Sequence, residues 1–409
     1  MKIVVVGAGI GGLGAALSLH AAGFRDIRLL DSAIELAPLG VGLNIQPNAV
    51  RELAALGLLG EVTAHAVATR ELAFYNLFGQ LIWREPRGTH AGNPWPQLAV
   101  HRGHLHKVLL NAATARLAPG SIITGTRATG MTHLPDDRVR LHLCSQTAER
   151  IWHLDADLVV GADGVHSALR HSLYPQESPP LWNGIAMWRG AAWVKPVLTG
   201  ASMLVAGDDV NRVVLYPIDQ QTDGGRSLVN WVIARPGDDA NGSATESDRE
   251  ELLRWIRRFW RCDWLDIDRI VRASPEILRH PMTDRDPLPR WSFGRVTLLG
   301  DAAHPMYPAG SNGATQAIID GRVLARCLAA ADDPSKELVE YENTRRAATS
   351  RIQLSNRGMG PESVISLVHQ RAPGGFARIT DVITESELMR VSSHYAGLTV
   401  ADRDDRGDE

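Results

Sequence analysis

Residues 2–14 read KIVVVGAGIGGLG, and this stretch decides the fold. The β-branched run at residues 2–6 is typical of a buried parallel strand, and an Ala- and Leu-rich helix follows the glycines to about Ala22. A second strand is expected at residues 26–31, DIRLLD. The three segments form a βαβ unit of about 30 residues, which predicts a Rossmann-like α/β domain.

The glycines between strand and helix have the spacing Gly7-x-Gly9-x-x-Gly12. Gly7 permits a tight turn, Gly9 lets the backbone approach a pyrophosphate, and Gly12 lets the helix pack close to the strand. The helix start offers free N–H groups and a partial positive charge to that anion. Asp31, at the end of the second strand, would accept hydrogen bonds from a ribose, which fits FAD or NAD better than NADP. The alternative is a buried helix start that merely tolerates glycine.

The composition is that of an ordinary globular enzyme. At 409 residues, two packed domains are expected, and a net charge of −3 gives no reason to expect nucleic acid or an anionic membrane as a partner. Cys144, Cys262 and Cys327 are odd in number and far apart, which predicts neither a disulfide framework nor a zinc site. None of the 15 histidines shows a metal-ligand spacing such as HExxH, and no apolar run of membrane-spanning length exists. We therefore expect a cytoplasmic protein without a metal.

The pattern changes twice along the chain. Residues 72–84 and 185–235 alternate apolar and polar side chains as strands do, and residues 246–262 read as an amphipathic helix on that sheet. Further helices are expected at 48–60, 101–118 and 313–330. The predicted division is a nucleotide-binding domain from 1–71, 101–180 and 286–345, an inserted sheet from 72–100 and 181–285, a helical region 346–400, and a disordered tail 401–409.

Two later motifs place a carboxylate at a strand end followed by small residues. They are GADGVHSALR at 161–170, with Asp163, and GDAAHP at 300–305, with Asp301. Such smallness is needed where a ligand or another backbone comes close. Either motif alone could equally be an Asp-capped turn, and His304 is more readily a structural partner of its turn than an acid–base group.

Together, GAGIGG, GADGVHSALR and GDAAHPMYPAGSNGATQAI resemble the class A flavoprotein aromatic monooxygenases, of the p-hydroxybenzoate and salicylate hydroxylase type. The likeness extends to about residue 350. PLGVGLNIQPNAV, HRGHLHKVLL, MWRG, SLVNWV and PMTDRDPLPRW are similar to members that act on phenazine carboxylates. The resemblance implies a glutathione-reductase-type FAD domain, an inserted mixed β-sheet substrate domain and a helical C-terminus.

The resemblance also implies a cofactor site. Gly9 to Gly12 and Asp31 would hold the ADP half, Arg102 the phosphates or ribitol, and Asp301 the ribitol. Asp163 belongs to a motif associated with both FAD and pyridine nucleotide, and a helix starting near Gly313 would stabilise negative charge on the reduced flavin. The implied set is Gly7, Gly9, Ile10, Gly11, Gly12, Asp31, Val41, Gly42, Leu43, Arg102, Asp163, Asp301, Pro308, Gly310, Asn312, Gly313 and Ala314. For Arg102 the alternative is a solvated surface arginine.

One dinucleotide fingerprint suggests one resident dinucleotide. If FAD is bound tightly there, NADH or NADPH docks transiently, and O₂ is the co-substrate. The resemblance implies hydroxylation of an aromatic ring through a flavin C4a-hydroperoxide, with or without decarboxylation, while the protein orients the ring and excludes water.

The expected substrate residues lie on the inserted sheet and before the flavin-facing helix. Alternation places Arg212, Val214 and Tyr216 on one face, where Arg212 could hold a carboxylate or phenolate and Tyr216 could orient or deprotonate a ring hydroxyl. These two are the catalytic candidates; the alternative is a surface arginine and an ordinary sheet tyrosine. The candidate set is Met187, Arg189, Arg212, Tyr216, Asn230, Tyr307 and Pro308.

The substrate class is narrowed but left open. The expected ligand is a small phenolic or carboxylated aromatic compound, and the tryptophans gathered between Trp182 and Trp264 suggest a sheet suited to a fused ring such as a phenazine. Salicylate-like and hydroxynicotinate-like acids remain alternatives. So do an FAD epoxidase or other flavin oxidase on this fold, and a flavin-binding redox sensor without turnover.

Overall fold

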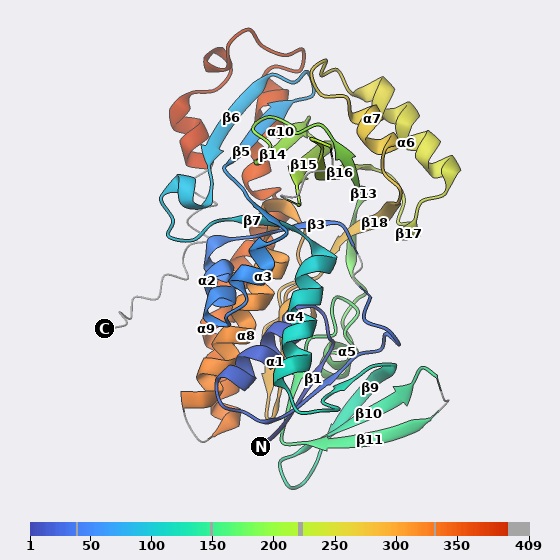
Figure 1. Ribbon diagram of the computed structural model, residues 1–409, viewed down its shortest axis with the longest axis vertical. Helices are drawn as coiled ribbons and strands as arrows, with labels where there is room; N and C mark the ends of the chain where they lie inside the picture. Colours follow the sequence, from blue (N-terminus) through green and yellow to red (C-terminus); the bar gives the residue numbers. More distant parts are fainter. Residues whose placement is uncertain (38–39, 148–149, 220–223, 331–332, 392–409) are drawn as a thin grey trace.

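The computed structural model describes residues 1–37, 40–147, 150–219, 224–330 and 333–391. Two layers stand one above the other in Figure 1. The lower layer is built around a six-stranded sheet and the upper layer around an eight-stranded sheet. The predicted disordered tail lies outside the described residues.

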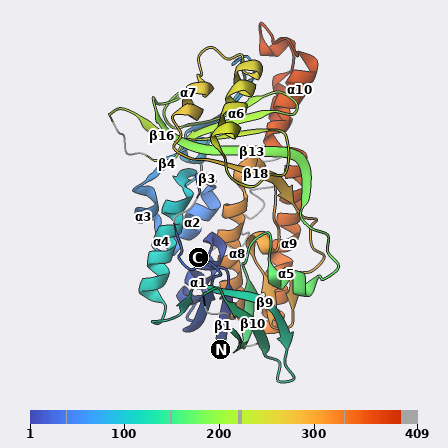
Figure 2. The same cartoon turned by 90° about the vertical axis from the view of Figure 1, so that its right-hand side faces the viewer.

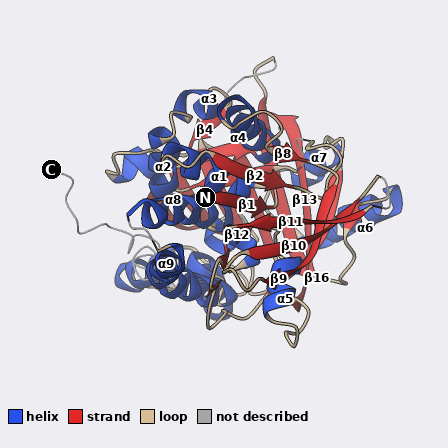
Figure 3. Cartoon of the chain, turned by 90° about the horizontal axis from the view of Figure 1, so that it is seen from below, coloured by secondary structure: helices blue, strands red, loops and turns tan. Residues whose placement is uncertain are grey.

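The six-stranded sheet is the predicted Rossmann-like core. The opening unit forms as expected, with β1 (Lys2–Val6), α1 (Ile10–Ala21) and β2 (Asp26–Leu30), and β1 pairs in parallel with β2 and β12. The strand order of the six-stranded sheet is β19 (Ser292–Phe293), β20 (Val296–Leu298), β12 (Leu158–Gly161), β1, β2 and β8 (Ile122–Ile123). The other helices of this layer are α2 (Pro47–Ala55), α3 (Leu59–Thr63), α4 (Arg102–Arg116), α5 (Ala168–Leu173), α8 (Gly313–Ala330) and α9 (Pro334–Arg357). Viewed from below in Figure 3, α1, α4 and α8 gather beside the strands.

The inserted sheet draws strands from two separated segments of the chain. Its order is β17 (Gly242–Ser243), β18 (Ile277–Asp284), β13 (Leu181–Val194), β16 (Ser227–Pro236), β15 (Arg212–Pro217), β14 (Ser202–Gly207), β5 (Glu71–Asn76) and β6 (Leu81–Pro86). The sheet is mixed, because β14 and β5 run parallel while the other neighbours are antiparallel. This confirms the predicted mixed substrate sheet, whereas the borders between domains stay a prediction.

The two faces of this sheet have different covers. The outer face packs on α6 (Glu246–Phe259) and α7 (Ile267–Arg272), which lie above the sheet in Figure 2. The inner face contacts α10 (Ser363–Arg371) through the buried side chains of Val364, Ile365 and Val368. The amphipathic helix predicted at 246–262 is thus confirmed, with Leu252, Leu253 and Ile256 buried.

One local prediction was wrong, and one sheet was missed. The single helix expected at 48–60 is divided into α2 and α3, because Gly57 has φ +71° and leaves the helical conformation. The three-stranded antiparallel sheet of β9 (Thr126–His133), β10 (Val139–Ser145) and β11 (Ile151–Ala156) was not predicted. Only β10 alternates clearly, with Val139, Leu141 and Leu143 buried, whereas β9 and β11 have a weaker apolar pattern.

A small sheet joins the layers. It consists of β3 (Gly42–Ile45), β7 (Leu98–His101) and β4 (Ala66–Ala68). Short 3₁₀ turns complete the structure: η1 (Gly88–Ala91), η2 (Gly300–Ala302), η3 (Ala309–Ser311), η4 (Gly360–Glu362) and η5 (Ile379–Asp381). Among the described helices, none is both long and apolar enough to cross a membrane. The cytoplasmic location stays a prediction.

Candidate active site

A cavity of about 400 Å³ lies between the two layers. Its lower wall comes from the starts of α1 and α8 and from η2, and its upper wall comes from the inner face of the eight-stranded sheet. The predicted residues that line it are Gly9, Ile10, Gly11, Gly42, Leu43, Arg102, Met187, Arg189, Arg212, Tyr216, Asp301, Tyr307, Pro308, Asn312, Gly313 and Ala314. Those that do not line it are Gly7, Gly12, Asp31, Val41, Asp163, Asn230 and Gly310.

The glycine turn is shaped by close backbone contacts. Gly7 has φ +103°, and a Cβ there would lie 2.3 Å from the Ala162 carbonyl oxygen. A Cβ on Gly12 would lie 1.8 Å from the Gly7 carbonyl oxygen. A Cβ on Gly9, by contrast, would meet no atom within 4 Å, and Gly9 lines the cavity. Gly7 and Gly12 therefore build the turn, and Gly9 leaves its open side free for a ligand.

Asp31 lies beside this turn and also supports it. Its carboxylate accepts hydrogen bonds from the backbone N–H groups of Ala8 (2.7 Å) and Ala33 (2.8 Å). A carboxylate has about four acceptor positions, so two remain for a ribose.

Asp163 has a capping role that the sequence left as an alternative. Its carboxylate accepts hydrogen bonds from the Ser167 hydroxyl (2.5 Å) and the Ala168 N–H (2.8 Å), at the start of α5. Burial raises the pKa of this carboxyl group, although the hydrogen bonds oppose the shift. Asp163 does not line the cavity and is engaged by its own helix, and its expected place in the cofactor site stays a prediction.

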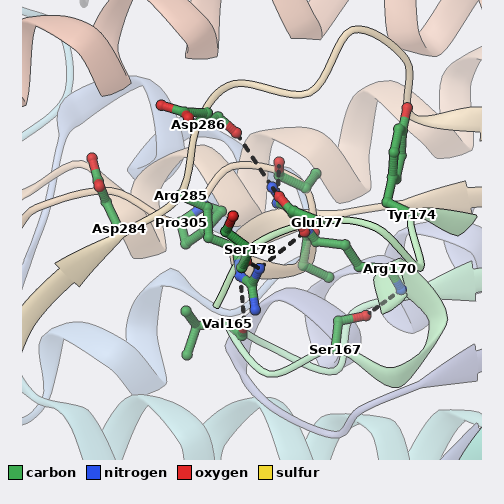
Figure 4. Close-up of polar contacts among 12 residues, drawn as sticks. Val165, Ser167, Arg170, Tyr174, Glu177, Ser178, Asp284, Arg285, Asp286 and Pro305 are labelled. Carbon is green, nitrogen blue, oxygen red and sulfur yellow. Dashed lines mark hydrogen bonds and ion pairs between the residues drawn. The ribbon is translucent and has the colours of Figure 1, made fainter. Parts of the chain in front are cut away.

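The Asp163 motif nevertheless supports the site through Arg170 (Figure 4). This buried guanidinium donates to the carbonyl oxygens of Ala302 (3.1 Å) and Ala303 (3.0 Å), next to Asp301. Glu177 pairs with Arg170 and also with Arg285, 2.9 Å away. The second motif thus positions the third, and with it Asp301.

Asp301 presents its carboxylate to the cavity from η2. No described residue donates a hydrogen bond to this carboxylate, although the protein around it raises the pKa by desolvation while His304 and Arg102 oppose the rise. Behind it, His304 contacts Asp320 (2.6 Å), as the predicted structural partner of its turn. A carboxylate without donors at the wall of a cavity fits a ligand that carries hydroxyl groups, such as a ribitol chain.

Two arginines in the cavity lack an acidic partner. Within the described part of the chain, neither Arg102 nor Arg189 forms an ion pair, and the Nε of Arg189 is buried without a hydrogen bond. Burial lowers the pKa of Arg102, the charge of Arg189 lowers it further, and Asp301 opposes both. Arg102 thus lines the cavity while it remains exposed, and its role at a cofactor stays a prediction. Two uncompensated cations fit anionic ligands, as FAD phosphates and a substrate carboxylate are.

Asn44 is a cavity residue that the sequence did not reveal. It lines the cavity, is buried, and has both polar side-chain atoms without a partner. Buried amides are normally satisfied, so this pair of orphaned atoms also fits a bound polar cofactor. The only signal was its position after Val41, Gly42 and Leu43.

The strand register arranges the upper wall in rows. One row is Arg212, Ala234, Met187 and His280, and the next is Val214, Val232, Arg189 and Leu278. Tyr216 opposes Asn230 in the third row. The predicted common face of Arg212, Val214 and Tyr216 is confirmed, since all three line the cavity.

Arg212 is already engaged by the protein. It donates to the carbonyl oxygens of Asp208 and Asn211, and to the Ser366 hydroxyl at 2.7 Å. Its Nε also lies 3.8 Å from a carboxylate oxygen of Glu362. The protein thus occupies most donors of Arg212 and places a carboxylate beside it, which weighs against the expected role in holding a substrate carboxylate. That role stays a prediction.

Asn230 also differs from the expectation. Instead of facing the cavity, its side-chain oxygen accepts a hydrogen bond from the Gly42 N–H (2.7 Å). A Cβ on Gly42 would lie 2.6–2.7 Å from Ile218, Asn230 and Tyr216. Asn230 therefore fixes the position of Gly42, at the start of β3 between the layers.

Two tryptophans of the central strands lie on the other face of the sheet. Trp188 and Trp231 are fully buried in the outer core against α6 and α7, because they alternate with Met187 and with Asn230 and Val232. The cavity lining in the described chain contains no tryptophan. Its soft apolar wall comes from methionines instead: Met187, Met203, Met282, Met306 and Met359.

Comparison with known proteins agrees with this site. The family model described as an FAD binding domain matches residues 1–354. The chain is 44% identical to phenazine 1,6-dicarboxylic acid hydroxylase PhzS of Lysobacter antibioticus, over 87% of this chain and 89% of that protein. It is 32% identical to 3-amino-4-hydroxybenzoate 2-monooxygenase of Streptomyces cremeus, over 88% and 87%.

Solved structures agree on the fold. The structure of Klebsiella pneumoniae HpxO with FAD and uric acid superposes with a TM-score of 0.76 at 22% identity, covering 98% of this chain and 97% of that one. The residues of the cavity fit FAD, with a glycine turn, two uncompensated cations and a free carboxylate along its wall. The chain therefore belongs to the FAD-binding family of aromatic monooxygenases, and it is an FAD-dependent, NAD(P)H- and O₂-using aromatic hydroxylase.

Proposed function

We propose that this hydroxylase acts on a fused aromatic carboxylate of the phenazine type and that Arg189 holds the carboxylate. The observation that carries the proposal is the state of Arg189, a cation at the cavity wall without an acidic partner among the described residues. The similarity to a phenazine dicarboxylic acid hydroxylase supports the ring system. Monocyclic acids are the second candidate, because other relatives act on 3-amino-4-hydroxybenzoate and 6-hydroxynicotinate.

The proposed cofactor roles follow from the wall of the cavity. The turn from Gly7 to Gly12 and the start of α1 would hold the pyrophosphate, Asp31 the adenosine ribose, and Asp301 the ribitol. Arg102 would neutralise phosphate charge. The proposed isoalloxazine contacts are Val41, Gly42, Leu43, Asn44, Pro308, Gly310, Asn312, Gly313 and Ala314.

The chain's own residues then have three tasks. Bound FAD would accept electrons from NADH or NADPH and activate O₂. Arg189 would orient the ring, and Tyr216 would offer a neutral hydroxyl beside it, because burial raises its pKa to about 12. Met187, Met282 and Tyr307 form a buried apolar cluster that would keep water from the reacting atoms. The proposal requires neither a metal nor a nucleic acid, and it holds with or without decarboxylation.

Arg189→Ala tests the proposal when acid and amide ligands are compared. We expect phenazine-1-carboxylate to stimulate NADH or NADPH oxidation by the holoenzyme with little peroxide. In the variant its Kd, measured from flavin absorbance, should rise roughly 10- to 100-fold, the loss of one charge-assisted contact. Phenazine-1-carboxamide should be affected less than about 3-fold, because it brings no negative charge.

The exposed Arg254 on α6 provides the matched control, and Arg254→Ala should behave as wild type. An equal loss for acid and amide would rule out the carboxylate role. Stimulation by 6-hydroxynicotinate or salicylate, but by no phenazine, would select the monocyclic candidate instead.

A further inference from the structure

Glu362 brings a second carboxylate, besides that of Asp301, to the cavity, from a part of the chain to which the family match does not extend. It ends η4, between α9 and α10, and the match covers residues 1–354. The turn is held by Met359, which has φ +64° and also lines the cavity. Glu362 is only 8% exposed, and it lines the cavity.

The carboxylate of Glu362 has a charge partner but no hydrogen-bond donor. Its Oε2 lies 3.8 Å from the Nε of Arg212, and that Nε makes no hydrogen bond. The remaining nitrogens of Arg212 donate elsewhere. Within the described residues, no group donates a hydrogen bond to the Glu362 carboxylate. A buried carboxylate in this state is incomplete, and an O–H or N–H group on a ligand would satisfy it.

The register places this acceptor across the cavity roof from Arg189. Arg212 and Arg189 stand on β15 and β13, with β16 between them and one row apart. Two strand spacings and one two-residue step put their Cα atoms about 12 Å apart. A fused-ring acid has the length to reach from Arg189 towards the Arg212–Glu362 pair.

We propose that Glu362 is a substrate-positioning residue that accepts a hydrogen bond from an N–H or O–H group on the ring, on the far side from the carboxylate held by Arg189. This rests on the proposed function and narrows it to aromatic acids that also carry a donor. An ionised Glu362 repels a second carboxylate at that position, so diacids are disfavoured.

Protonation modifies this preference. Burial raises the pKa of Glu362 to about 7, while Arg212 opposes the rise. The other charged groups around η4 are paired elsewhere: Arg357 of α9 with Asp284, and His369 of α10 with Asp209. Asp208 and Asp209 act on Arg212. A protonated Glu362 would donate to a second carboxylate, so binding of a diacid should tighten as the pH falls through about 7.

The test compares three ligands that share one acid group. They are phenazine-1-carboxylate, 6-aminophenazine-1-carboxylate and phenazine-1,6-dicarboxylate, and their Kd values for the holoenzyme are measured from flavin absorbance at pH 6 and pH 8.5. For wild type at pH 8.5 we expect 6-aminophenazine-1-carboxylate to bind at least 10-fold tighter than phenazine-1-carboxylate. Phenazine-1,6-dicarboxylate should bind most weakly of the three at pH 8.5. Its binding to wild type should be at least 5-fold tighter at pH 6 than at pH 8.5.

Glu362→Gln should reverse this pattern. The preference for 6-aminophenazine-1-carboxylate over phenazine-1-carboxylate should fall below about 3-fold. Phenazine-1,6-dicarboxylate should bind at least 5-fold tighter than to wild type at pH 8.5, and the pH dependence of its Kd should disappear. Glu385→Gln, at an exposed position of the same region, should keep the wild-type values. If Glu362→Gln does not fold, the wild-type ratios and their pH dependence decide alone.

The outcomes separate this inference from the proposed function. If the acids bind, and Arg189→Ala weakens them, but Glu362→Gln leaves ratio and pH dependence unchanged, Glu362 does not position the substrate. If wild type binds no phenazine acid at all, the proposed function itself is overturned.

Discussion

Tyr216 illustrates how burial decides which chemistry a side chain can perform. Its hydroxyl belongs to a buried ring at the cavity wall, and burial raises its pKa to about 12 although Arg189 opposes the rise. The phenol is therefore neutral at any pH at which the enzyme would be assayed. A neutral hydroxyl favours the role of hydrogen-bond donor, and the role of proton acceptor that the sequence allowed stays a prediction to be tested.

Tyr216→Phe should therefore change affinity without changing pH dependence. We expect KM for the aromatic acid to rise roughly 5- to 10-fold, the value of one neutral hydrogen bond, and kcat to change less. The pH profile of kcat/KM between 6 and 9 should keep its shape. Loss of one limb of that profile in the variant would mean that Tyr216 does transfer a proton in the reaction.

At the scale of residues, the sequence predicted the positions of residues within motifs better than it predicted contacts between residues far apart in the chain. Asp301 and Arg102 lie at the cavity wall as expected, because each follows a local pattern that sets its direction. Arg212 was placed on the correct face, but its neutralisation by Glu362 could not be foreseen, since the two are 150 residues apart. Asn44 and Glu362 have no local signature at all.

Among the elements, α8 and α9 carry the buried charges that support the site. Asp320 of α8 accepts hydrogen bonds from Arg345 of α9 (2.8 Å) and from the Gly300 N–H (3.1 Å), and contacts His304. Burial acts to raise the pKa of Asp320, but His304 and Arg345 outweigh it and lower the pKa. One carboxylate thus joins two helices to the turn that presents Asp301.

Asp320→Asn should destabilise the protein strongly, because it removes the buried carboxylate that pairs with Arg345 and His304. We expect a loss of about 3–5 kcal/mol in the free energy of unfolding, measured by denaturant titration at pH 7. A lowered folded pKa stabilises the protein above the unfolded pKa and loses that effect as the pH falls through the folded value. The difference from wild type should therefore be constant from pH 5 to 8 and shrink below about pH 4.

The exposed Asp263→Asn should leave stability within about 0.5 kcal/mol of wild type. If Asp320→Asn were equally mild, the buried ion pair would not support the junction of α8, α9 and η2.

The sequence predicted elements where one face is clearly apolar. The helix expected at 313–330 is α8, with the same bounds, and the opening βαβ unit is correct. The sheet β9–β11 was missed although Val139, Leu141 and Leu143 of β10 alternate with polar residues and are buried in the lower core. Only this one of the three strands alternates clearly, and a single short alternating strand does not predict a sheet.

For the whole molecule, activity depends on how the two layers are held together at the cavity. Gly42 begins β3 in the small sheet that joins the layers, and it lies close to Tyr216 and Ile218 of the upper sheet. The hydrogen bond from the Gly42 N–H to Asn230 crosses between the layers, and Arg189 contacts the Gly42 carbonyl oxygen at 3.4 Å. The start of β3 and the inner face of the eight-stranded sheet are thus held relative to each other by the contacts of Gly42.

Asn230→Ala should loosen this junction without emptying the cofactor site. FAD retention should change less than about 3-fold, because the glycine turn, Asp31 and Asp301 are untouched. The Gly42 N–H would lose its acceptor in a buried position, at a cost of about 1–3 kcal/mol, so the loop should move relative to the sheet. A displaced ring lets reducing equivalents escape as hydrogen peroxide instead of hydroxylated product.

The readout is the ratio of peroxide to NAD(P)H consumed in the presence of the aromatic acid. It should rise several-fold in Asn230→Ala, and at least as much in Gly42→Ala, whose methyl group would meet Tyr216 and Asn230. Asn343→Ala, on the exposed side of α9, should keep the wild-type ratio. A variant at Asn230 that loses FAD but stays coupled would place this hydrogen bond in cofactor binding alone. A rise in peroxide with FAD retained would instead establish that coupling depends on the register between the two layers.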